Sequence, residues 1–278
     1  MSATLLDLEA YVFVWSIIQF IHLSDISLKS FSEITAVEKM LAEEKMKRIR
    51  KKANRKKNLI SPFKYLIVID FEATCFEKPF NRNKQEIIEF PAVLLNLETG
   101  AIEKEFHKYL RPVEIPILSE YCTNLTGITQ DTVDSGELIL DVVEEFRQWM
   151  KKTIKEYELV LPKTKKSNVE GNCGFCTWGN WDFLIQLRNE CNRKKVRRPS
   201  FFNQWIDLKA IYVEKGTFKD QFTFGDALIQ SGIEFVGRPH NGLDDARNTA
   251  MLAWKMHKEG SYLRITKDLN QHAMNAHW

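Results

Sequence analysis

The chain has 278 residues, of which 44% are hydrophobic and 28% are charged. This composition excludes a disordered or fibrous chain and allows a full hydrophobic core, enough for one domain of about 200 residues plus an appendage. Its formal net charge of +3 is uneven, because residues 45–57 hold nine basic and no acidic residues, and the rest carries 31 basic against 37 acidic residues. A basic arm on a mildly acidic body indicates a tether for a polyanion, a nuclear import signal or a solvated helix face.

The five cysteines favour reduced thiols, since their number is odd and they are spread over a mid-sized chain. We therefore expect a cytoplasmic or nuclear protein. Cys173 and Cys176 form a single CxxC pair. Without a second pair, this motif is predicted to be structural and not a zinc or redox site.

Residues 1–60 are predicted to form an appendage with an apolar segment followed by a basic helix. The apolar run, residues 10–23, is shorter than the roughly 20 residues of a membrane-spanning helix. Asp7 and Glu9 precede it without any Lys or Arg, which is unlike a secretory signal. We expect a helix that packs on the body or on a partner, without stable membrane insertion. Residues 61–265 are predicted to form the main domain, and residues 266–278 a C-terminal tail.

From Tyr65 the pattern becomes that of alternating strands and helices. Strands are predicted over residues 65–71, 88–97, 102–110, 173–178 and 201–208, and helices over 118–125, 138–157, 183–191, 223–231 and 244–258. The first three strands form an antiparallel opening, and the later strands alternate with helices. This order predicts an α/β fold with a mixed five-stranded sheet and helices on both faces.

Two carboxylates end the first strand. Side chains of a strand alternate between faces, so Asp70 and Glu72 point the same way while Phe71 enters the opposite layer. Two neighbouring anions at the end of a buried strand are costly unless a cation lies between them, and a hard divalent ion with oxygen ligands fits best. An isolated Asp-x-Glu is more often simply the polar end of a strand, so the pair needs partners.

Later segments supply those partners. Asp182 lies where a strand gives way to a helix, and a glycine-punctuated loop carries His240 into a helix that begins with Asp244 and Asp245. Asp244 alone indicates an ordinary helix cap or first-turn acid, and His107, His257 and His272 indicate surface or packing positions. Four carboxylates, from Asp70, Glu72, Asp182 and Asp245, can hold two Mg²⁺ ions about 3.5 to 4 Å apart, with Asp70 as the bridge. A histidine side chain exchanges protons near neutral pH, so a histidine at the edge of such a site, His240, can accept a proton from the attacking water.

Five ordered blocks carry a family resemblance: residues 69–75 (Ile-Asp-Phe-Glu-Ala-Thr-Cys), 86–91 (Glu-Ile-Ile-Glu-Phe-Pro), 125–129 (Leu-Thr-Gly-Ile-Thr), Trp181-Asp182 and 237–248. Together they resemble the DEDDh 3′→5′ exonucleases over about residues 64–260. More narrowly, they are similar to the Eri branch, which includes the histone-mRNA 3′-end exonucleases. The resemblance implies a ribonuclease H-like fold and hydrolysis of terminal phosphodiesters to nucleoside 5′-monophosphates.

The resemblance also implies individual roles. Asp70, Glu72 and Asp245 would bind one metal ion, Asp70 also the second, and Asp182 would support that second site, while His240 would be the general base. Two Mg²⁺ ions, replaceable by Mn²⁺, would be the cofactors. The residues implied in nucleotide binding are Ala73, Thr74, Tyr121, Trp181 and His240, with the two aromatic rings stacking on the terminal nucleotide. Tyr121 equally suits a core position of its helix.

The substrate is less defined than the chemistry. RNA is the expected partner, with single-stranded DNA as an alternative, and residues 45–57 would contact phosphates. Residues 1–60 do not match the helical nucleic-acid-binding module of the histone-processing members, and no cysteine follows Cys191 to form their relatives' C-terminal zinc finger. Two rival hypotheses are a nucleic-acid-binding module with weak catalysis and a DNA proofreading or repair exonuclease. The oligomeric state stays open.

Overall fold

The computed structural model describes residues 61–78, 82–162, 171–216 and 222–271. The predicted N-terminal appendage and the basic arm 45–57 lie outside the described residues. In the described part of the chain, no helix combines the length and the apolar character needed to cross a membrane.

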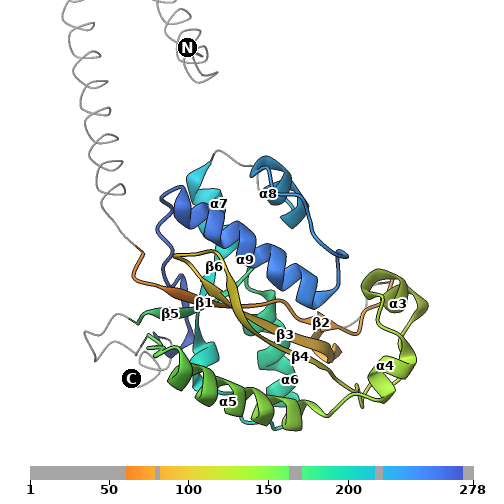
Figure 1. The fold of residues 1–278 in the computed structure, drawn as a ribbon. Coiled ribbons are helices and arrows are strands. Elements are labelled where there is room, and N and C mark those ends of the chain that lie inside the picture. Colours follow the sequence, from red (N-terminus) through yellow and green to blue (C-terminus); the bar gives the residue numbers. More distant parts are fainter. Residues whose placement is uncertain (1–60, 79–81, 163–170, 217–221, 272–278) are drawn as a thin grey trace, which may run out of the picture. The chain divides into compact units, whose positions relative to one another are not determined.

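The centre of the fold is a mixed β-sheet (Figure 1). Strands pair in the order β2-β3-β1-β5-β6-β7, with β4 also paired to β3. The pairs β1–β3 and β3–β4 are antiparallel, whereas β5 runs parallel to β1 and β6 parallel to β5. The strand bounds are β1 Tyr65–Ile69, β2 Glu72–Ala73, β3 Ile87–Asn96, β4 Ile102–Tyr109, β5 Cys173–Thr177, β6 Gln204–Asp207 and β7 Lys267–Asp268. This arrangement confirms the ribonuclease H-like α/β class.

The predicted number of five strands was wrong, because two short strands join the sheet. β2 pairs with β3 beyond the end of β1, and Phe71 lies in the gap between β1 and β2. The gap arises because the Phe71 amide donates to the Asp182 carboxylate at 2.9 Å instead of continuing the ladder. β7 pairs antiparallel with β6, so the sheet extends past residue 265, where the predicted domain ends. The division into residues 1–60, 61–265 and 266–278 remains a prediction.

The helices begin and end close to the predicted positions, with three differences. Helices α4 and α7 were not predicted, and the predicted helix 183–191 consists of a π-helical segment, η2, followed by α6. α7 was missed because Asp207 ends β6 and at once caps α7, its carboxylate accepting the Ala210 amide at 2.9 Å. The bounds are α3 Glu120–Thr126, α4 Gln130–Asp134, α5 Ile139–Glu156, η2 Trp181–Leu187, α6 Arg188–Arg193, α7 Leu208–Lys215, α8 Phe224–Gln230 and α9 Gly242–Lys258, with 3₁₀ turns η1 Arg82–Lys84, η3 Ser200–Asn203 and η4 Leu269–Gln271.

Two cores lie on opposite faces of the sheet. α5, η2 and α6 cover one face, and α7, α8 and α9 cover the other (Figure 1). The alternation of β1 divides its side chains between them, since Ile67 packs in the first core and Leu66 and Val68 in the second. A smaller third cluster joins α3 and α4 to β3 through Ile88. With both faces covered, the ends of the strands remain as the open place for polar side chains.

Phe146 tests the first core. Its ring is fully buried on α5 and lies 4.9 Å from the Phe90 ring and 5.5 Å from the Phe202 ring. Phe146→Ala should reduce the free energy of unfolding by about 3 to 5 kcal/mol, because it leaves a cavity among these rings. Urea denaturation measures the change.

Ile229→Ala is the control for Phe146→Ala, since Ile229 is 77% exposed on α8. It should change the free energy of unfolding by no more than about 0.5 kcal/mol. Equal losses in the two variants would contradict the assignment of the core.

Candidate active site

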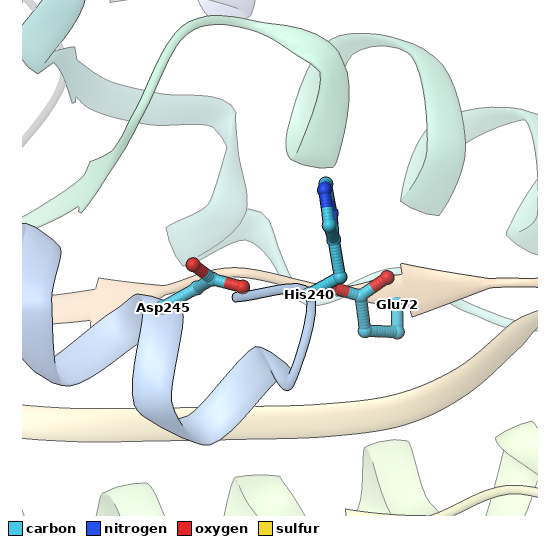
Figure 2. Close-up of side chains that lie close together, drawn as sticks. All are labelled: Glu72, His240 and Asp245. Carbon is cyan, nitrogen blue, oxygen red and sulfur yellow. The ribbon is translucent and has the colours of Figure 1, made fainter. Parts of the chain in front are cut away.

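Three predicted site residues converge in the structure. Glu72, His240 and Asp245 each offer one ligand atom, and these atoms lie within 4.8 Å of one another. Glu72 comes from β2, Asp245 from the first turn of α9, and His240 from the loop that precedes α9 (Figure 2). Segments far apart in the sequence thus bring two carboxylates and an imidazole to one point at the end of the sheet.

Asp70 and Asp182 lie beside this trio without being part of it. Asp70 directly follows β1, and Asp182 is the second residue of η2. The Asp182 carboxylate accepts the amide N–H of Phe71, the residue that follows Asp70, and so lies beside this part of the chain. The charges of Asp182, Asp245 and Glu72 all act on Asp70, so the four carboxyl groups form one electrostatic cluster.

Burial and mutual repulsion make this cluster unfavourable without cations. Burial, followed by the neighbouring carboxylates, raises the pKa of Asp70 and of Glu72 well above their usual values. Burial likewise raises the pKa of Asp182 and of Asp245 to about 7. Among the described residues, none of the four carboxylates forms an ion pair with Lys or Arg. A set of oxygen donors that lacks a protein cation is the chemistry that hard divalent ions satisfy, so the residues fit a metal site.

Polar contacts fix the loop that carries His240. His240 itself has a left-handed backbone with φ of 63°, and its amide donates to the Asp245 carboxylate. The Arg238 amide donates to Asp244 at 2.9 Å, and a Cβ at Gly237 would lie 2.3 Å from the same Asp244 oxygen. The Asn248 side chain contacts both the N–H and the C=O of residue 236. Asp244 is therefore more than the first-turn acid expected from sequence, since it shapes the loop.

Of the predicted nucleotide-binding residues, His240 belongs to the converging trio, whereas Ala73, Thr74, Tyr121 and Trp181 do not. Ala73 and Thr74 are buried, and the Thr74 hydroxyl accepts the Glu86 amide at 3.1 Å. Tyr121 is 42% exposed on α3, so the alternative core position does not hold. Trp181 opens η2 and packs partly buried against the first core. Their contacts with a nucleotide remain predictions.

Sequence analysis missed one carboxylate beside the site. Glu89 is fully buried on β3 and pairs across the strands with Glu72. Its carboxylate accepts the amides of Gly242 and Leu243 at 2.9 and 3.2 Å. The signal was present in the sequence, because Glu89 is an acid inside an otherwise apolar strand, Ile87–Asn96. An acid at such a position must have buried donors.

Comparisons with known proteins agree with this geometry. The family model described as "Exonuclease" matches residues 67–253. The 3'-5' exonuclease Snipper of Drosophila melanogaster is 47% identical over 243 residues, which cover 87% of this chain and 85% of the fly protein. ERI1 exoribonuclease 2 of Homo sapiens is 46% identical over 213 residues, which cover 75% of this chain and 30% of the human protein. The crystallographic structure of the nuclease domain of 3'hExo, a DEDDh family member bound to rAMP, superposes with a TM-score of 0.62 at 36% identity, covering 75% of this chain and 99% of that domain.

Asp182→Asn tests the electrostatic cost of the cluster. In metal-free protein Asp182 is neutral at low pH and ionised above about pH 7, while Asn stays neutral throughout. Because the folded-state pKa lies above the usual 3.8, the parent loses stability relative to the variant as pH rises from about 4 to 7. Thermal unfolding in EDTA should show the variant gaining roughly 5 °C in Tm over the parent between these limits.

With saturating Mg²⁺ the parent should have the higher Tm, because bound metal stabilises the parent more than a variant that lacks one ligand. A difference in Tm that is independent of both pH and Mg²⁺ would contradict the cluster.

Proposed function

Since the chain belongs to the exonuclease family, in its DEDDh Eri branch, we propose that it hydrolyses RNA from the 3′ end with two divalent metal ions and His240 as general base. The chain is thus a metal-dependent 3′→5′ exonuclease. We propose the ligand set, the number and kind of the ions, and the natural substrate. Mg²⁺ is the proposed ion, and Mn²⁺ its substitute.

One observation carries the proposal. Glu72, His240 and Asp245 converge within 4.8 Å, next to a carboxylate cluster whose charges no basic side chain of the described residues neutralises. A binding module without catalysis would need neither the imidazole at that point nor four carboxylates with raised pKa values. The convergence therefore favours hydrolysis over binding alone.

Each side chain has a distinct proposed task. Asp70, Glu72 and Asp245 hold one ion, Asp70 also reaches the second, and Asp182 supports that second site. His240, exposed on its loop, removes the proton from the attacking water. When bound, two ions stabilise the attacking and leaving oxygens of the phosphodiester. The partly or fully buried carboxylates would hold the ions at the end of the sheet, and the exposed histidine is accessible to water and RNA.

RNA is the proposed substrate because the similar human protein is named an exoribonuclease and one similar structure holds rAMP. The exposed ring of Tyr121 on α3 suits stacking on any base, and Trp181 offers a second, partly buried ring. Residues 45–57 are proposed to contact phosphates, and the compartment is proposed to be the cytoplasm or nucleus. The chain spans 85% of the fly relative but 30% of the human one, so its activity need not match the whole human protein.

Asp70→Asn should abolish cleavage while the fold remains intact. The variant removes the proposed bridging ligand, so we expect a rate at least about 1,000-fold lower, equivalent to about 4 kcal/mol of transition-state stabilisation. A 5′-labelled RNA in Mg²⁺ reports shortening from the 3′ end, and EDTA should stop the parent enzyme.

Asp141→Asn is the matched control for Asp70→Asn, because Asp141 is exposed in the first turn of α5, away from the site. It should retain the parental rate. Undiminished cleavage by Asp70→Asn, in material free of other nucleases, would refute the mechanism. Parallel assays on RNA and DNA strands of one sequence separate an exoribonuclease from a DNA exonuclease.

His240→Asn tests the general base. Asn tolerates the left-handed backbone at this position, so the loop should keep its shape. We expect kcat to fall by roughly 10²- to 10⁴-fold. Mn²⁺ binding should be unchanged if His240 is a base, and a parallel loss of Mn²⁺ affinity would instead make it a metal ligand.

A further inference from the structure

Glu89 is a buried charge that the proposed reaction leaves unexplained. It is fully buried on β3, beside the metal site, and its negative charge raises the pKa values of Asp70, Glu72 and Asp245. It therefore makes an already crowded set of anions harder to assemble. A carboxylate at such a cost requires contacts that a neutral side chain cannot make.

Those contacts hold the beginning of α9. The two oxygens of Glu89 accept the amides of Gly242 and Leu243, the first two residues of the 17-residue helix. Anions are stabilised at this position by the free amides and by the helix macrodipole. Gly242 packs so closely that a Cβ would lie 2.7 Å from the backbone oxygen of Asp70. Glu89 thus holds the start of α9 in contact with the end of β1, where Asp70, the proposed bridging ligand, lies.

Two side chains of β4 support this contact. The imidazole Nε2 of His107 lies 2.8 Å from a Glu89 oxygen, and an ionised carboxylate can only accept, so His107 donates. The His107 ring packs edge-on against the Tyr109 ring at 4.8 Å, and the Tyr109 hydroxyl contacts the side chain of Asn241, the N-cap of α9. His107 is therefore neither a free surface histidine nor simple packing.

We propose that Glu89, oriented by His107, is a positioning residue that sets both Asp245 and His240 by holding the first amides of α9. Asp245 lies three residues after Gly242, and His240 lies two residues before it. Through these amides, Glu89 fixes the spacing between Asp245, a proposed metal ligand, and His240, the proposed base. The inference rests on the proposed two-metal reaction, in which that spacing determines the rate.

Glu89→Gln tests the inference, because it keeps the shape of the side chain but places an amide NH₂ against donors. In the full-length protein with 5′-labelled RNA, kcat at saturating Mn²⁺ should fall roughly 10- to 100-fold. KM for RNA should stay within about threefold of the parent, since Glu89 is fully buried and has no surface to offer to RNA. Glu103→Gln, an exposed position on β4, is the matched control and should keep the parental kcat.

Saturating Mn²⁺ separates positioning from charge. If Glu89 served only to attract cations, its loss would weaken Mn²⁺ binding, yet parental kcat would return at saturation, and that result would overturn the inference. His107→Phe retains the ring and the charge of Glu89 but cannot donate. His107→Phe should lower kcat by a smaller factor than Glu89→Gln does. If Glu89→Gln does not fold, His107→Phe alone tests the inference, and parental kcat in His107→Phe overturns it.

Binding of Mn²⁺, followed by the electron paramagnetic resonance of the free ion, keeps the two proposals distinguishable. If the parent protein cleaves no RNA with Mn²⁺, the proposed function fails. In that case, Mn²⁺ binding alone tests the positioning role, because neither His107→Phe nor Glu103→Gln alters the site carboxylates. Weaker Mn²⁺ binding by His107→Phe than by Glu103→Gln would support the role, and equal binding would overturn it.

Discussion

The burial of several carboxylates at one end of the sheet is the constraint on which the site depends. Burial raises the pKa of Asp70, Glu72, Asp182 and Asp245, and the charges of neighbouring carboxylates add to the shift at Asp70 and Glu72. Like charges stay together only if the backbone holds them and a cation compensates them. Amide donors supply the first condition, since Phe71 donates to Asp182 and His240 donates to Asp245. The divalent ions of the family supply the second.

The same constraint explains local irregularities of the fold. β1 and β2 are separate strands because the Phe71 amide leaves the sheet for the Asp182 carboxylate. The segment that carries Asp182 is π-helical, and π-helical turns are frequently found at functional sites. The left-handed backbone of His240 is a third departure, held by the bonds of Asp244 and Asn248 to the same loop. All three lie at the site, where local strain is expected.

The helical segments that carry the proposed ligands are anchored on opposite faces of the sheet. α9 belongs to the second core, through residues such as Ala250 and Leu252, and its first turn reaches the site. η2 belongs to the first core through Phe183 and reaches the site from the opposite side. The ligands thus come from elements anchored in different cores. A rigid sheet between them keeps the carboxylates at fixed separations, which metal-assisted hydrolysis requires.

The sequence by itself determined the α/β class and the five main strands. It also predicted Asp70, Glu72, Asp182, His240 and Asp245 as site residues, because acids and a histidine at the ends of elements are local properties of the chain, and the structure brings Glu72, His240 and Asp245 together. Only the tertiary structure decided the role of Glu89 and His107, since their contacts join β3, β4 and α9, which lie far apart in the sequence. Likewise, α7 escaped detection because its capping residue, Asp207, also ends a strand. The position of Glu89 inside an apolar strand indicates that it needs buried donors, but packing sets which donors those are, so no local pattern could identify them.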